Sequence, residues 1–163
     1  MLREKFNELL DKTVEALKKH YNERLISVVL FGSVARKKHR PDSDIDLLIV
    51  VENLPKSRLK RIEEFEKVEE EVDPLIGRLR KEGIFTSLSP IIRAPEEIRQ
   101  GSFLFLDLIE DGRILFDRND FFKDYIHNLR EKLKLIDAKR VWLGSAWYWI
   151  IKSHTKSGKN IDL

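Results

Sequence analysis

Two aspartates, Asp44 and Asp46, are the residues of this sequence best placed for chemistry, because they alternate along an otherwise apolar stretch. Side chains two residues apart on a strand point to the same face, so both carboxylates are expected to project together. Paired carboxylates suit a hard divalent cation such as Mg²⁺, which prefers oxygen ligands and needs few from the protein. The plainer alternative is that Asp42, Asp44 and Asp46 line the polar side of an exposed strand. Aspartate is depleted in strands, which favours the metal site.

A Gly32-Ser33 turn follows the apolar run that ends at Phe31 and stands ten residues before the aspartates. A turn that opens a helix offers unpaired backbone N–H groups and a hydroxyl to an anion, commonly phosphate. A phosphate cradle beside a metal site indicates chemistry on a nucleoside triphosphate. Among the basic residues that follow the turn, Arg36 lies nearest to it and is the best candidate to contact the triphosphate. The alternative is that this charge run is only solvated.

The two features at this spacing resemble the signature of the DNA polymerase β-type nucleotidyltransferase superfamily, and in particular its minimal nucleotidyltransferases. Local detail agrees with the resemblance in the residues that surround the motif, namely Phe31, Ala35-Arg36 and Ser43. A looser resemblance extends to Phe116. It implies a mixed α/β fold in which helices flank a central sheet.

The resemblance also implies an activity, the Mg²⁺-dependent transfer of a nucleoside monophosphate to an acceptor hydroxyl with release of pyrophosphate. The donor would be a nucleoside triphosphate, expected to be ATP. Asp44 and Asp46 would be the catalytic residues that hold the metal. The nucleotide would be bound by Gly32, which lets the phosphates approach closely, by Ser33 and by Arg36.

In one respect the sequence departs from the superfamily, whose members usually place a third carboxylate on the next core strand. The strand expected over residues 84–93 carries no acid, and Ser87 and Ser89 share one of its faces. Serine does not act as a general base near neutral pH without help. The third acid is therefore expected from elsewhere, with three candidates: Glu96, Glu97 and Asp107. Otherwise the protein is a catalytically weak or inactive nucleotide-binding module.

A further alternative concerns partners, because some minimal nucleotidyltransferases pair with a small helical protein in toxin–antitoxin systems. The resemblance then implies a protein side chain as acceptor, typically a tyrosine hydroxyl of that partner. RNA is a weaker alternative. It rests on the C-terminal part, since residues 118–163 hold 10 basic and 5 acidic side chains, against 21 basic and 23 acidic in residues 1–117.

Composition limits the class of protein. At 163 residues the chain is long enough for one domain with a sizeable core. It has no cysteine, which excludes disulfides and thiolate metal sites. No apolar run reaches the roughly 18 residues of a membrane span, and the charged N-terminus does not resemble a signal peptide. We therefore expect a cytoplasmic protein without membrane contact.

The resemblance implies a nucleotidyltransferase domain over residues 1–117. The hydrophobic pattern predicts a helical, aromatic C-terminal extension packed on it over residues 118–163. Asp73-Pro74 resembles an N-cap followed by a first-turn proline, which predicts a break or a kink in the helical region 56–83. All three tryptophans fall in the extension. Their segment is expected to be a strand or helix packed on the core, a partner interface or a base-stacking surface. The predicted helices span 2–21, 56–83, 103–111 and 119–136, and the predicted strands span 25–31, 44–51, 84–93 and 113–116.

Overall fold

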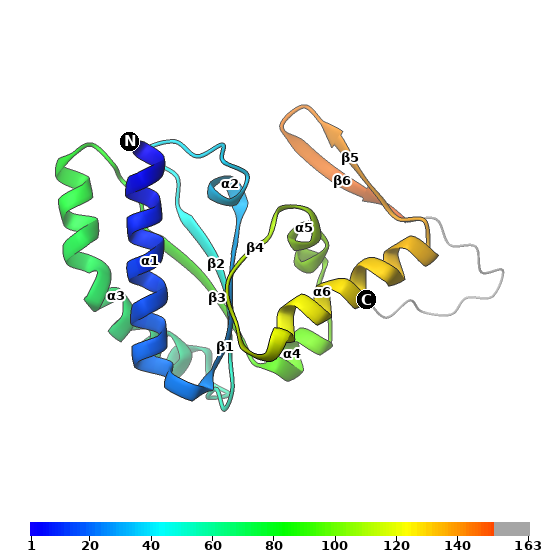
Figure 1. Ribbon diagram of the computed structural model, residues 1–163, viewed down its shortest axis with the longest axis horizontal. Coiled ribbons are helices and arrows are strands. Elements are labelled where there is room, and N and C mark those ends of the chain that lie inside the picture. Colours follow the sequence, from blue (N-terminus) through cyan, green and yellow to red (C-terminus); the bar gives the residue numbers. More distant parts are fainter. Residues whose placement is uncertain (152–163) are drawn as a thin grey trace.

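The computed structural model describes residues 1–151, which form a mixed α/β fold around a four-stranded sheet (Figure 1). The strand order is β3-β2-β1-β4, with β1 antiparallel to both neighbours and β2 parallel to β3. The predicted mixed sheet is therefore confirmed. The strands are β1 (Leu25–Phe31), β2 (Ile45–Val51), β3 (Leu88–Arg93), β4 (Arg113–Asp117), and, in a separate hairpin, β5 (Lys139–Leu143) and β6 (Ala146–Ile150).

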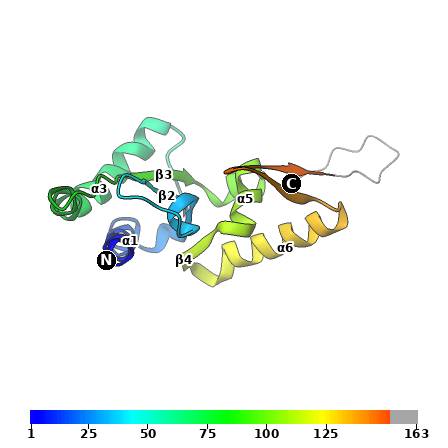
Figure 2. The ribbon, with the colours of Figure 1, turned by 90° about the horizontal axis from the view of Figure 1, so that it is seen from above.

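Helices cover both faces of the sheet, as the view from above shows (Figure 2). Helices α1 and α3 pack on one face, and α4, α5 and α6 lie on the other. The order along the chain is α1 (Leu2–Tyr21), α2 (Gly32–Ala35), α3 (Arg58–Lys81), α4 (Pro95–Arg99), α5 (Phe103–Asp111) and α6 (Phe121–Leu135). Among residues 1–151, no helix combines the length and the apolarity that crossing a membrane requires.

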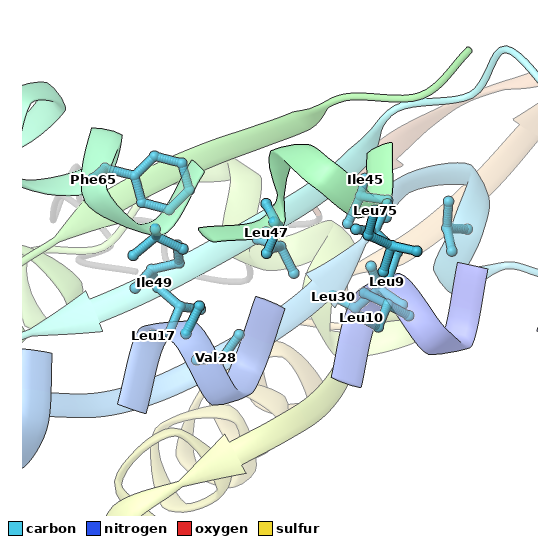
Figure 3. Packing of buried hydrophobic residues seen from close by; sticks show 14 of the residues in the cluster. Leu9, Leu10, Leu17, Val28, Leu30, Ile45, Leu47, Ile49, Phe65 and Leu75 are labelled. Carbon is cyan, nitrogen blue, oxygen red and sulfur yellow. The ribbon is translucent and has the colours of Figure 1, made fainter. Parts of the chain in front are cut away.

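The core follows from alternation along the two central strands. Val28 and Leu30 of β1, with Leu47 and Ile49 of β2, meet α1 and α3 on one face (Figure 3). Their alternate neighbours, Val29, Leu48 and Val50, meet the helices of the other face. Each of these side chains is fully buried, which stabilises the fold by roughly 1.5–3 kcal/mol per residue. The central strands are thus fixed in position from both sides.

The helical region does not break at Asp73-Pro74, because α3 runs without interruption through Pro74 and is capped by Ser57, while a kink there stays a prediction. A proline inside a helix removes one hydrogen bond and costs about 3 kcal/mol. Burial on both sides of the proline exceeds this cost, since four apolar side chains form one stripe toward the core. These are Val68, Val72, Leu75 and Leu79.

The edge strand β3 begins at Leu88, later than the predicted start at residue 84. The chain before it is nevertheless tied to the sheet, because Ile45 N–H donates to the carbonyl of Ser87 (2.9 Å). Phe85 N–H donates to the carbonyl of Pro41 (2.8 Å). These bonds hold the residues just before β3 beside the N-terminal end of β2, where the two aspartates lie.

The tryptophan-rich segment is a β-hairpin outside the main sheet. It leaves the end of α6, extends with its tip toward α2 and then runs back toward the end of α6 (Figure 1). The prediction of helical and aromatic elements after residue 117 agrees with α6 and this hairpin, while the division of the chain at residue 117 stays a prediction. The end of the predicted extension, residues 152–163, lies outside the described residues.

Candidate active site

The two aspartates meet at one edge of the sheet. Asp44 directly precedes β2 and is exposed, and Asp46 is the second residue of that strand and is half-buried. Asp46 is paired with Phe31 on β1 and with Ser89 on β3. The carboxylates therefore stand where β1 ends and β3 begins, next to the turn at Gly32.

Gly32 is in direct contact with this acidic pair. Its φ is +74°, a conformation that favours glycine. A Cβ at this position would overlap Oδ2 of Asp46 and lie 3.1 Å from its Cγ. The sequence suggested that glycine lets phosphates approach. The structure adds a nearer reason, which is that the missing side chain makes room for the carboxylate of Asp46.

The two serines near the start of β3 take the place beside the aspartates. Ser87 Oγ donates a hydrogen bond to Oδ1 of Asp44 (2.8 Å). The hydroxyl of Ser89 stabilises the charged form of Asp46, which acts to lower the pKa of that carboxyl. The prediction that the region 84–93 runs beside the aspartates is confirmed, with serines where the superfamily usually has an acid.

The environment of Asp46 suits a cation. Burial raises its pKa above the ordinary value of 3.8, and the neighbouring charge of Asp44 raises it further, while Ser89 and Arg36 oppose the shift. Two carboxylates that repel each other in a half-buried place are stabilised by a divalent ion with oxygen preference. Within residues 1–151 no group of three or more His, Cys, Asp or Glu side chains is arranged to hold a metal ion. The two carboxylates fit a hard cation such as Mg²⁺, which takes few ligands from the protein and keeps several of its waters.

The structure brings none of the candidate third acids to this pair. Glu97 accepts two hydrogen bonds from Arg61 (3.0 and 2.9 Å) and one from the N–H of Ala94 (2.8 Å), and so caps α4. Glu96 is exposed on the same short helix. That helix follows the far end of β3, roughly 13 Å along the strand from Ser89 at about 3.3 Å per residue. Asp107 accepts hydrogen bonds from two indole N–H groups instead.

The phosphate-binding candidates lie on α2 and directly after it. Ser33 is half-buried in the first turn, where backbone N–H groups have no partner inside the helix. Arg36 follows the helix, and its charge lowers the pKa of Asp46, so it stands close to the acidic pair. Arg36 Nη1 is also 3.8 Å from Oδ2 of Asp111 at the end of α5.

Sequence reasoning missed Asp111 and its partner Arg140 on β5. Arg140 Nη1 donates to Oδ2 of Asp111 (2.7 Å), and both side chains are nearly buried. Asp111 thus joins the hairpin to Arg36. The available signal was an acid on the last residue of a helix, where the macrodipole disfavours negative charge unless a cation is near.

Residues 10–100, more than half of the chain, match the family model described as "Nucleotidyltransferase domain". The chain belongs to the nucleotidyltransferase family. The matched span contains Gly32, Ser33, Asp44, Asp46 and both serines of the site. Nucleotidyltransferases generally use a divalent metal, which agrees with the donor set found here.

Similar proteins extend this nucleotidyltransferase assignment. MJ1305 of Methanocaldococcus jannaschii, provisionally named a protein adenylyltransferase, is 31% identical over 143 residues, which cover 83% of this chain and 92% of the relative. The crystal structure of spectinomycin adenyltransferase AAD(9) from Enterococcus faecialis, with ATP and spectinomycin, shares the fold (TM-score 0.55, 16% identity, 80% of this chain and 67% of that one). A chain from a toxin–antitoxin complex with AMP-PNP is less similar (TM-score 0.45, 18% identity, 78% and 94%). The sheet and its helices are the polymerase β-like nucleotidyltransferase fold.

Proposed function

We propose that this nucleotidyltransferase transfers the nucleoside monophosphate of ATP to a hydroxyl group of a protein. The proposal rests on the convergence of Asp44 and Asp46 with the Gly32-Ser33 turn at one sheet edge. Their backbone positions and chemistry fit a triphosphate and its cation. In the reaction the acceptor oxygen bonds to the α-phosphorus, the bond between that phosphorus and the bridging oxygen breaks, and pyrophosphate leaves.

Each residue of the site has a proposed part. Asp44 and Asp46 hold the divalent cation, taken to be Mg²⁺, which when bound neutralises charge on the phosphates. Ser33 donates its hydroxyl and N–H to a phosphate oxygen. Arg36 lies beside the acidic pair and supplies positive charge to the triphosphate. Gly32 keeps Asp46 in its place.

The proposed acceptor, a protein hydroxyl, is suggested by the similarity to MJ1305. MJ1305 is 31% identical over most of both chains and is provisionally named a protein adenylyltransferase, which supports a protein hydroxyl as acceptor here. The sequence-based expectation of a small helical partner protein is compatible with this acceptor, and tyrosine is the expected side chain.

Turnover is proposed to be slow. The places beside Asp44 and Asp46 are occupied by Ser87 and Ser89, which do not accept a proton at neutral pH. An acceptor hydroxyl then loses its proton without a positioned third carboxylate. General-base assistance is worth about 10²–10⁴-fold in rate, which is the scale of the expected deficit.

Isothermal titration calorimetry of ATP with and without Mg²⁺ tests the site. The parent protein is expected to bind ATP more tightly with Mg²⁺, and the double variant Asp44→Asn/Asp46→Asn is expected to lose this dependence while it keeps its circular dichroism spectrum. The matched control is Asp42→Asn, which removes an exposed aspartate two residues earlier. Equal Mg²⁺ dependence in parent and double variant would rule out the proposed metal ligands.

A further inference from the structure

The hairpin presents one aromatic and cationic face. In its register Arg140 is paired with Trp149, and Trp142 with Trp147, so these four side chains lie on the same side of the two strands. The opposite side carries Val141 and its neighbours Leu143, Tyr148 and Ile150. A face that combines indole rings with a guanidinium group has the chemistry for planar, electron-rich ligands.

Two aspartates of α5 fix this face to the body of the enzyme. Asp107 accepts the indole N–H groups of Trp147 and Trp149, the latter at 3.1 Å. Asp111 accepts both terminal nitrogens of Arg140, at 2.7 and 3.4 Å. The hairpin is therefore held in a defined position on α5, although it belongs to a separate sheet.

The same face reaches the segment that follows the Gly32-Ser33 turn. The guanidinium of Arg36 lies 4.9 Å from the centroid of the Trp147 ring, and Lys38 Nζ lies 5.5 Å from that of Trp142. Figure 1 shows the tip of the hairpin beside α2, and the view from above agrees (Figure 2). Since the charge of Arg36 also acts on Asp46, Arg36 links the acidic pair to the tryptophan face of the hairpin.

Trp142 is the member of this face that remains open. It is 43% exposed, and its ring stands 4.9 Å from Trp147, tilted by 56°. Of the two cations near its ring, Arg140 is held by Asp111, whereas Lys38 is on an exposed, flexible side chain that can move aside for a planar ring. Trp147 and Trp149 are held by Asp107, so the open ring stands on a fixed support.

We propose that the hairpin is the nucleobase wall of the site and that the base of the bound nucleotide stacks on Trp142. This inference rests on the proposed function, because it places the triphosphate at Ser33, Arg36 and the acidic pair. A nucleotide anchored there extends along the surface through Arg36 toward the tryptophans. Base stacking on an aromatic side chain is worth roughly 1–3 kcal/mol, which corresponds to about 5- to 150-fold in affinity.

The chain offers a direct optical test, since all three of its tryptophans are in the hairpin and intrinsic tryptophan fluorescence reports on it alone. The parent is titrated with Mg²⁺·ATP and with Mg²⁺·tripolyphosphate, which has no base. We expect ATP to quench the fluorescence strongly, tripolyphosphate to leave it nearly unchanged, and calorimetry to show tighter binding of ATP.

Three variants separate stacking from support of the fold. Trp142→Ala is expected to bind ATP about 5- to 150-fold more weakly, with affinity for tripolyphosphate unchanged. Trp142→Phe, which keeps an aromatic ring, is expected to retain most of the affinity for ATP. Tyr148→Ala is the matched control, because Tyr148 is 50% exposed on the opposite face of the same hairpin.

The outcomes distinguish the two proposals. Equal quenching by both ligands, or an equal loss of both affinities in Trp142→Ala, would overturn the nucleobase wall and leave nucleotide binding intact. Unchanged affinity of Trp142→Ala for ATP would do the same. If the parent binds neither ATP nor tripolyphosphate, the result would contradict both the proposed function and the nucleobase wall.

Discussion

Gly32 and Asp46 are so close that glycine is the only residue that leaves the carboxylate in place. A Cβ on Gly32 would overlap Oδ2 of Asp46, although the two residues belong to different elements, α2 and β2. The turn at Gly32 and the strand that carries Asp46 are therefore one unit. A change at either residue should affect both the proposed phosphate binding and the proposed metal binding.

Gly32→Ala is expected to abolish measurable Mg²⁺·ATP binding, because the new side chain displaces the carboxylate of Asp46. Part of any loss of stability will come from the positive φ alone, at about 1–2 kcal/mol. Gly83→Ala is the matched control, since Gly83 has φ +86° and open space around it. In urea unfolding Gly83→Ala should show the loss due to φ alone and Gly32→Ala at least that loss, and only Gly32→Ala should lose binding. Normal ATP affinity in Gly32→Ala would show that Asp46 tolerates displacement.

The raised pKa of Asp46 predicts a trade between stability and function. Its folded-state pKa lies above the ordinary 3.8 because of burial, so the folded protein binds this proton more readily than the unfolded chain. Ionised Asp46 therefore costs stability at neutral pH. Asp46→Asn should raise the Tm of the metal-free protein at pH 7, while it removes Mg²⁺·ATP binding.

The pH dependence of this effect follows from the same sign. The Tm advantage of Asp46→Asn should shrink as the pH falls through the raised pKa of Asp46 and vanish below about pH 3.8, where the carboxyl is neutral in both states. Scanning calorimetry of parent and variant across this range measures the difference directly. A variant that is less stable than the parent at pH 7 would indicate that the carboxylate is well solvated.

Serines stand beside Asp44 and Asp46 where a third carboxylate would act as base, so replacing one of them by aspartate should increase the rate of transfer. Ser87 already donates to Asp44, so Ser87→Asp places a third carboxylate at the metal site. Its transfer rate is expected to rise by up to about 10²–10⁴-fold, the range of general-base assistance. Ser87→Asn, of the same size without the base, is the control and should remain slow. If both variants are equally slow with Mg²⁺ present, a missing base does not limit the rate.

Local patterns predicted the parts of the fold that local chemistry decides. The alternation of Asp44 and Asp46, and the turn that precedes them, correctly predicted that the two aspartates lie together at one sheet edge beside Gly32. The interruption expected at Pro74 did not occur, because burial of Val72 and Leu75 against elements distant in sequence outweighs one lost hydrogen bond.

Other features depend on tertiary contacts that no spacing reveals. The contact between Arg36 and Asp111 joins residues 75 positions apart, and the seat of the hairpin on Asp107 depends on how α5 packs against the sheet. The candidate acid Asp107 was assigned by type alone, and its position shows that it binds tryptophan instead.

The most direct test of the account follows the α-phosphate. The protein is incubated with Mg²⁺ and a cell extract of its source organism, and with ATP labelled on either the α- or the γ-phosphate. We predict that the parent attaches α-label to protein through a bond stable to denaturation and releases γ-label as pyrophosphate. The variant Asp44→Asn/Asp46→Asn should neither attach α-label to protein nor release labelled pyrophosphate. Transfer of γ-label to protein, or equal α-label transfer by the double variant, would contradict the account.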